Sequence, residues 1–208
     1  MIRSLPVCFA NALRRGPRRA NVALLLVLAC APIVAAQVRP NHLSGQAAPY
    51  LKRAVLQPVD WYPWGADAFE RARELDRPIL LDVGAVWCPW CTLMDRDTYT
   101  VPATADYINQ HFVAVKVDLD AAPKLVAQLQ RAQAILNLPA GLPLTSFITP
   151  DGKLYFGSGY LPNTRQGDKP SFQEAADEAL KGATQISPSL QKTRFNWRST
   201  NEEEMDCV

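Results

Sequence analysis

Cysteine and histidine are scarce in this sequence, whose 208 residues include five cysteines and two histidines. A small scaffold held together by disulfides uses more cysteines, and a chain of this length can bury one hydrophobic core without them. A zinc site needs four ligands, typically two close cysteine pairs or one pair with histidines nearby. Only His42, His111 and the distant Cys207 could complete such a site around Cys88 and Cys91, so we expect no metal.

The N-terminal apolar run is too short for a membrane-spanning helix, which needs about 20 residues. It covers residues 22–36, contains Pro32 and follows a stretch with four arginines. This arrangement is typical of a secretory signal peptide, here residues 1–36, with cleavage after Ala36. We therefore expect a periplasmic or secreted protein. The alternatives are attachment to a membrane through lipidation of Cys30 or through an uncleaved N-terminal segment.

A basic excess is also absent once this segment is removed. Residues 1–36 hold five of the 22 basic residues and no acids, which leaves 17 basic and 20 acidic residues and a net charge of −3. Nucleic acid is therefore not an expected partner. In an exported chain, the cysteines meet an oxidising or actively managed thiol environment.

Hydrophobic periodicity predicts strands that alternate with helices from residue 66 onward. This alternation favours an α/β fold, in which a mixed sheet has helices on both faces and a hairpin adds an antiparallel edge. We expect an aromatic and proline-rich extension at 37–64, a domain at 65–183 and a polar, flexible tail at 184–208. Helices are predicted at 66–76, 91–99, 103–111, from 123 to about 136, and from 171; strands are predicted at 79–83, 112–120, 144–149 and 153–158.

Two cysteines, Cys88 and Cys91, follow the first predicted strand at the start of a helix. A structural disulfide is one interpretation, but a bridge across two residues closes almost no loop and stabilises the fold little. A redox centre fits the position better, because the positive end and free N–H groups of a helix favour a thiolate at Cys88. Pro89 suits the first helical position. We expect Cys88 to attack a partner disulfide and Cys91 to resolve the mixed disulfide.

The segment "ILLDVGAVWCPWC" resembles the active-site segment of the thioredoxin superfamily. Asp82 stands six residues before the first cysteine, and Trp87 immediately precedes it. The resemblance implies a thioredoxin-like fold. It also places Lys116 where thioredoxins carry a lysine near the buried acid, and Pro143 where they carry a cis-proline that faces the cysteines.

A more specific resemblance extends over residues 41–162 and includes "PVDWYPWG" and "ITPDGKLYFGSGYLP". These stretches are similar to the thioredoxin-like domain at the front of spermatogenesis-associated protein 20 and its bacterial relatives. Two features depart from that pattern. Pro89 and Thr92 stand where the family commonly has histidines, and Leu142 replaces a common tryptophan.

The candidate catalytic residues also include Asp82, Lys116 and Pro143. A charge in a buried strand is costly unless it is used or paired, so we predict that Asp82 accepts the proton of Cys91 through water and that Asp82→Asn stabilises the fold. The alternative for Asp82 is a solvated strand end. Lys116 either contributes to this chemistry, as the resemblance implies, or keeps its amine in water above the strand.

The candidate substrate-binding residues are Trp87, Trp90, Leu142 and Pro143. The backbone beside a cis-proline stays free to pair with an extended chain. The two tryptophans either pack or offer an apolar surface to a partner beside the sulfur. The aromatic cluster at 61–64 either packs against the domain or forms a groove wall.

We therefore expect an exported thiol-disulfide oxidoreductase without metal or organic cofactor. Pro89 and Trp90 bring no positive charge to the site, which favours a reductant or isomerase over a strong oxidant. Its expected partners are cysteine-containing exported proteins and, by analogy with other exported thioredoxins, a membrane thiol carrier. The alternative is a non-catalytic binding or chaperone module with a permanently bridged pair.

Overall fold

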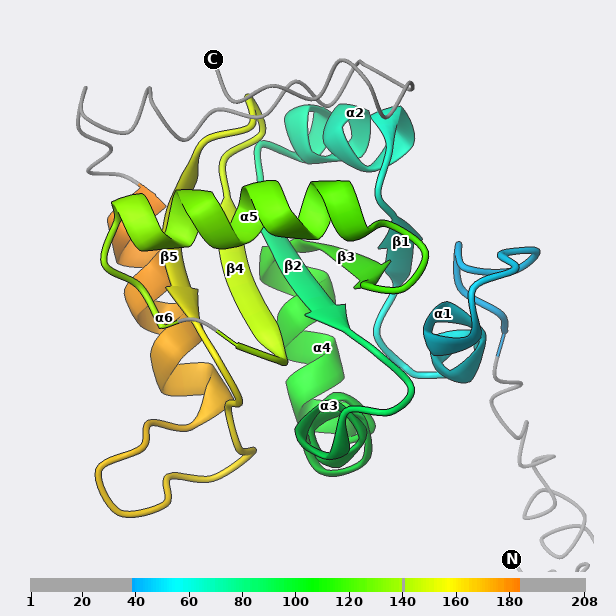
Figure 1. The fold of residues 1–208 in the computed structure, drawn as a ribbon. Coiled ribbons are helices and arrows are strands. Elements are labelled where there is room, and N and C mark those ends of the chain that lie inside the picture. The colour runs from blue at the N-terminus through cyan, green and yellow to red at the C-terminus, as the bar shows by residue number, and fades with distance from the viewer. Residues whose placement is uncertain (1–38, 140, 184–208) are drawn as a thin grey trace, which may run out of the picture. The chain divides into compact units, whose positions relative to one another are not determined.

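A computed structural model describes residues 39–139 and 141–183. Five strands form one mixed sheet in the order β1-β3-β2-β4-β5 (Figure 1). The strands are β1 (Trp61–Pro63), β2 (Ile79–Gly84), β3 (Val113–Asp118), β4 (Leu144–Ile148) and β5 (Leu154–Ser158). The helices are α1 (Pro49–Ala54), α2 (Ala66–Leu75), α3 (Pro89–Met94), the π-helical turn η2 (Asp95–Tyr99), α4 (Pro102–His111), α5 (Pro123–Ile135) and α6 (Phe172–Ala183).

The sheet has a parallel part and an antiparallel part. β3 pairs in parallel with both β1 and β2, while β4 pairs antiparallel with β2 and β5. All residues of β2 and β3 are buried, as expected for central strands covered on both faces. The predicted α/β architecture and its hairpin are therefore confirmed.

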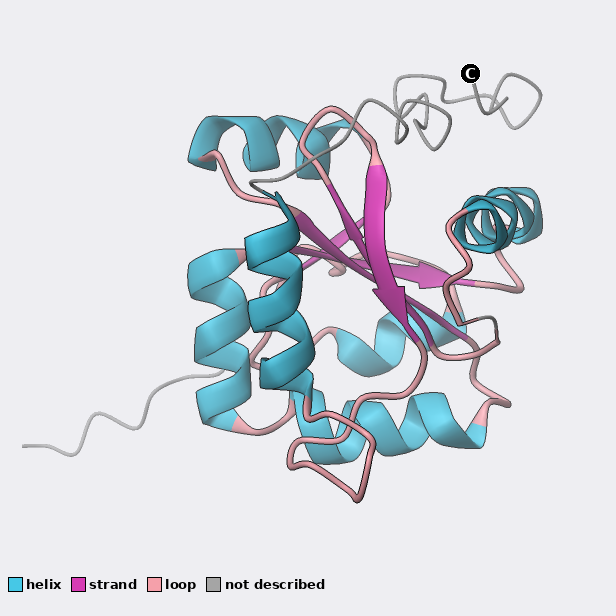
Figure 2. Cartoon of the chain, turned by 90° about the vertical axis from the view of Figure 1, so that its left-hand side faces the viewer, coloured by secondary structure: helices cyan, strands magenta, loops and turns pink. Residues whose placement is uncertain are grey.

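Helices cover both faces of the sheet (Figure 2). One face packs on α2 and α5 through the side chains of Ile79, Leu81 and Val83. Leu80 faces the opposite layer, which includes residues of α1, α4 and α6. Because successive strand residues point to opposite faces, Asp82 points into this second layer together with Leu80.

The segment expected as an extension is part of the fold. Its described residues, 39–64, supply helix α1 and edge strand β1, which pairs with β3 through Trp61, Tyr62 and Pro63. Trp61 is fully buried in the core, which confirms the packing interpretation for this aromatic residue. The sheet and core therefore begin before residue 65.

Local signals set several helix ends as predicted. Ser171 and Glu174 form a capping box, in which the Ser171 amide donates to Glu174 (2.8 Å) and the Glu174 amide donates to the Ser171 hydroxyl (3.3 Å). α3, α4 and α5 each begin with a proline, where its missing N–H has no helical partner to lose.

The predicted signal peptide and tail, 1–36 and 184–208, lie outside the described residues, as do Cys30 and Cys207. In the part of the chain that is described, no helix is both long and apolar enough to cross a membrane.

Candidate active site

Cys88 and Cys91 form a disulfide at the junction between β2 and α3. Cys88 is the N-cap residue of α3, and its sulfur accepts a hydrogen bond from the backbone N–H of Cys91 at 3.1 Å. Pro89 occupies the first helical turn. The sulfur of Cys88 therefore lies at the free amide end of the helix, where the helix dipole and N–H groups favour negative charge.

Both cysteines are buried, and they differ slightly in exposure. Cys88 is 4% exposed and Cys91 is completely buried. Trp87 and Trp90 flank the pair and are 60% and 54% exposed. Of the two cysteines, only Cys88 keeps any exposed surface, and it lies beside two exposed indole rings.

A buried ion cluster lies on the sheet beneath α3. The parallel register of β2 and β3 places Asp82 opposite Lys116, and the Lys116 ammonium contacts the Asp82 carboxylate at 2.6 Å. The same ammonium contacts Asp95 of η2 at 2.8 Å. Asp82 and Lys116 are both completely buried, so neither reaches water as the sequence-based alternatives allowed.

Aromatic side chains surround this ion cluster. The Lys116 ammonium lies 4.3, 4.6 and 5.1 Å from the ring centroids of Tyr50, Trp61 and Tyr99, within the range of cation–π attraction. The hydroxyls of Tyr50 and Tyr99 donate to the Asp82 carboxylate at 2.8 and 3.2 Å. Asp82 is therefore compensated by an ion pair and two hydrogen bonds, and the premise of an unpaired carboxylate, from which Asp82→Asn was expected to stabilise the fold, is wrong.

The pKa values of Lys116, Tyr50 and Tyr99 are all raised. Burial alone lowers the pKa of Lys116, but the charges of Asp82 and Asp95 outweigh it and the net shift is upward from 10.5. Burial, followed by the charge of Asp82, raises the pKa of Tyr50 and Tyr99 well above 10.0. Stability from groups with raised pKa is present below their unfolded pKa values and is lost as pH rises through the folded ones, so alkali weakens the contribution of these three groups.

Tyr50 of α1 links the ion cluster to the cysteines and was missed by the sequence reasoning. It packs in one group with Cys88 and Cys91 while its hydroxyl reaches Asp82. Its backbone N–H donates to Asp118 at the end of β3 (3.0 Å). A methyl group on Gly84 would lie 2.4 Å from the tyrosine ring. A glycine inside an apolar strand was the signal available, since it often marks close approach of another group.

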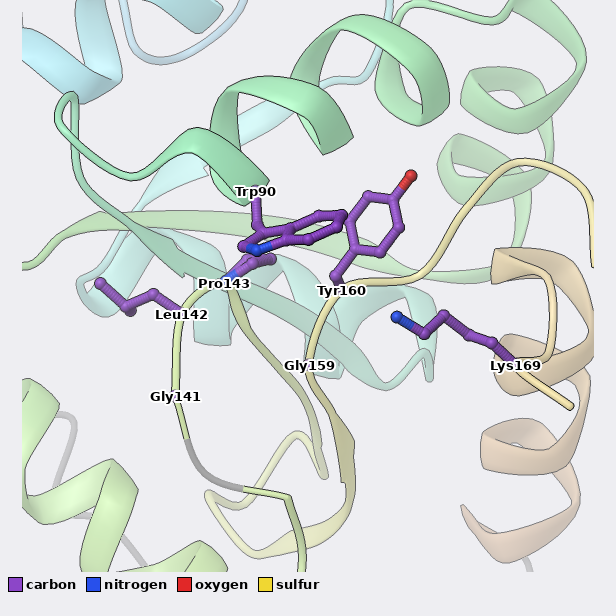
Figure 3. A pocket seen from close by; sticks show the side chains of 7 residues that line it. All are labelled: Trp90, Gly141, Leu142, Pro143, Gly159, Tyr160 and Lys169. Atoms are coloured by element: carbon purple, nitrogen blue, oxygen red, sulfur yellow. The ribbon is translucent and has the colours of Figure 1, made fainter. Parts of the chain in front are cut away.

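Pro143 and Leu142 lie at a cavity beside the disulfide. The Leu142–Pro143 peptide bond is cis, and both residues line a cavity of about 330 Å³ together with Trp90 and Tyr160 (Figure 3). Leu142 also packs against the group that contains both cysteines. The structure therefore brings Trp90, Leu142 and Pro143 together, while Trp87 lies apart and donates from its indole N–H to Asp120 at 2.9 Å.

The histidines weighed as metal ligands lie in other environments. His42 contacts Asp60 at 3.4 Å and stacks on Tyr62, and His111 packs near Tyr107. Within residues 39–139 and 141–183, no group of three or more histidine, cysteine or acidic side chains is arranged to hold a metal ion.

The family model described as "Protein of unknown function, DUF255" (Thioredox_DsbH) matches residues 40–198. The chain belongs to this family. It is 38% identical over 123 residues to uncharacterized protein B0495.5 of Caenorhabditis elegans, in a match that covers 59% of this chain and 17% of that protein. It is 33% identical over 123 residues to spermatogenesis-associated protein 20 of Homo sapiens, covering 59% and 16%. The family resemblance seen in the motifs is confirmed, and the chain spans about a sixth of these relatives.

Solved structures with similar folds include "DsbH Oxidoreductase", which is 21% identical, with 62% of this chain and 86% of that chain covered and a TM-score of 0.43. A thioredoxin from Thermus thermophilus is also 21% identical, with 60% and 86% covered and a TM-score of 0.41. The thioredoxin-like fold of this DUF255 chain rests on the matched family, Thioredox_DsbH, and on its own mixed sheet covered by helices.

Replacing Asp82 by Asn should destabilise the protein. The amide would leave Lys116 without its partner on β2, and breaking a buried ion pair costs about 3–5 kcal/mol. Urea unfolding with the disulfide intact measures this cost. The double variant Asp82→Asn/Lys116→Met removes both charges and should lose less stability than Asp82→Asn alone. Equal or greater losses in the double variant would contradict a compensated ion pair.

Replacing Gly84 by Ala should also destabilise the protein, because the new methyl overlaps the ring of Tyr50. Overpacking of this kind costs about 1–3 kcal/mol. The loss, measured by urea unfolding, should shrink in a Tyr50→Ala background. Gly182→Ala is the matched control, since its methyl would meet Tyr155 only at 3.5 Å and should leave stability unchanged or higher. A loss that is independent of Tyr50 would refute the steric explanation.

Proposed function

We propose that this protein is an exported thiol-disulfide oxidoreductase that reduces or isomerises disulfides in other extracytoplasmic proteins. The observation that supports this proposal is the different position of the two cysteines. Cys88 is the N-cap residue of α3 and keeps a small exposure of 4%, whereas Cys91 lies inside the helix and has none. A nucleophile must reach its substrate, whereas a resolving thiol has to reach only the mixed disulfide.

The reaction starts from the reduced dithiol. The Cys88 thiolate attacks one sulfur of the substrate disulfide, which breaks the substrate S–S bond, forms a mixed disulfide and releases one substrate thiolate. The Cys91 thiolate then attacks the Cys88 sulfur and releases the second. Two electrons pass to the substrate, and the Cys88–Cys91 disulfide forms. A dithiol carrier must return two electrons and two protons before the next cycle.

The buried ion cluster supports the resolving step. Cys91 must lose a proton before it attacks, and the ion cluster holds two carboxylates, Asp82 and Asp95, against the single ammonium of Lys116. Asp95 follows Cys91 by four residues, and its N–H donates to the Cys91 carbonyl, so both lie on one face of the helix. Tyr50 packs in one group with Cys91 and donates to Asp82, so we assign Asp82 as the acceptor of this proton, with Lys116 and Tyr50 as positioning residues.

Charge at the site also favours a reductant or isomerase. A strong oxidant owes its potential to a stabilised reduced form with a very acidic thiol. Here Pro89 and Trp90 bring no positive charge between the cysteines, and the ion cluster has one more negative than positive group. Excess negative charge beneath the pair disfavours the dithiolate, and hence the reduced form.

Export is supported by the arginine-rich and apolar N-terminal pattern of residues 1–36. In that compartment, the substrates would be cysteine-containing exported proteins. A membrane-embedded thiol carrier would return the electrons. Membrane attachment through Cys30 or an uncleaved N-terminus is the alternative location.

A second candidate is a non-catalytic binding or chaperone module. The exposure of Trp87 and Trp90 favours it, because two exposed indoles offer a partner an apolar contact. In that case the disulfide stays closed. Redox titration separates the two, since a structural disulfide has a potential below about −300 mV.

The variant Cys91→Ser should accumulate stable mixed disulfides between Cys88 and client proteins, because nothing remains to resolve them. Nonreducing gels of the exported fraction would show these adducts, which should disappear on addition of dithiothreitol. Cys88→Ser is the matched control and should trap little, since Cys91 is buried. Adducts formed only by Cys88→Ser would reverse the two roles.

Equilibration of the purified protein with glutathione buffers should give a potential between about −300 and −150 mV. The reduced fraction can be counted by thiol alkylation and mass spectrometry. A potential above about −150 mV would contradict the proposed reductant or isomerase and indicate an oxidase instead. A value below about −300 mV would support the binding module.

A further inference from the structure

The two indole rings beside the disulfide each have a charged side chain next to them, and the two charges are opposite. Trp87 donates to the carboxylate of Asp120. Trp90 packs against Tyr160 with ring centroids 5.0 Å apart, and the ammonium of Lys169 lies 5.7 Å from the Trp90 ring and 5.0 Å from the Tyr160 ring. The surface around Cys88 is therefore acidic on one side and basic on the other.

The cavity lies on the basic side. Trp90, Tyr160 and Lys169 line it together with Leu142 and Pro143. The ammonium of Lys169 points toward Tyr160 (Figure 3). Leu142 connects this cavity to the cysteines, because it packs against their group as well. A chain whose disulfide has reached Cys88 would therefore have one flank at this cavity.

The charge of Lys169 is not neutralised by the described part of the chain. Asp97 and Glu174, two acids of the neighbouring segments, are each paired with an arginine, Arg96 and Arg165 respectively. No described carboxylate lies within 4.0 Å of the Lys169 ammonium, whose recorded contacts are the two aromatic rings. Ring contacts hold a cation in place without removing its charge.

We propose that this cavity selects substrates with an acidic side chain beside the cysteine of their disulfide, and that Lys169 determines this specificity. The inference rests on the proposed function and names the substrate class of the same site. The substrate carboxylate pairs with the Lys169 ammonium, while the neighbouring apolar atoms pack on Tyr160 and Pro143. The same acid on the opposite flank would meet Asp120 and be repelled, so the preference has a direction along the bound chain.

The test uses peptides that contain one intramolecular disulfide and one varied residue, which is Glu, Gln or Lys. The varied residue stands immediately before one of the two cysteines in the first series and immediately after it in the second. The pre-reduced protein is mixed with each peptide, and the second-order rate of thiol release is measured at low and high salt. In the series whose varied residue lies on the Lys169 side of the bound chain, the Glu peptide should react about two- to fivefold faster than the Gln peptide, as expected for a partly exposed ion pair. The Lys peptide of that series should react more slowly than the Gln peptide. High salt should reduce these differences.

The charge reversal Lys169→Glu should invert this order, making the Lys peptide the fastest of the three. Lys153→Glu is the matched control, because it changes the net charge equally. Lys153 follows β4 at the end that pairs with Ile79, at the opposite end of the sheet from the cysteines, so the original order should persist.

Equal rates for the three peptides in both series would overturn the specificity and leave an uncharged groove. If Lys153→Glu also lost the preference for the Glu peptide, the preference would be an effect of the protein's net charge and not of Lys169. Failure to reduce even the Gln peptides would reject the proposed function itself, and the specificity with it.

Discussion

The ion pair between Lys116 and Asp82 is the interaction on which the rest of the site depends. Two opposite charges sit on adjacent central strands with no access to water, and such a pair persists only when its geometry and remaining hydrogen bonds are satisfied. Tyr50 and Tyr99 supply those bonds from α1 and η2. The need to satisfy one buried carboxylate therefore docks two helical segments on the sheet, directly beside the cysteine pair.

The π-helical turn η2 follows from the same requirement. It directly continues α3 and carries both Asp95, which contacts Lys116, and Tyr99, which contacts Asp82. Such turns are rare and occur frequently at functional sites. Asp95 and Tyr99 are four positions apart, so both side chains of this segment reach the ion pair from one face, while Cys91 lies buried one turn earlier.

Much of the fold was predictable from local sequence, because periodicity, helix caps and turn residues act over a few positions. The hairpin, the capping box at Ser171 and the place of the cysteines at a strand–helix junction were all found this way. The roles of Tyr50 and Lys116 depend on pairings across 32 and 34 positions, which local patterns do not encode. For that reason local patterns place β1 and α1 in an extension, and only the family resemblance brings Lys116 near Asp82.

The buried ion cluster and the cavity beside the cysteines are built from different parts of the chain. Asp82, Lys116 and Asp95 come from β2, β3 and η2, whereas Lys169 lies between β5 and α6 and its ammonium lies near the rings of Trp90 and Tyr160. None of the three residues of the ion cluster is among the residues that line the cavity. A substitution at Lys169 therefore leaves the contacts of the ion pair that stabilises the fold in place.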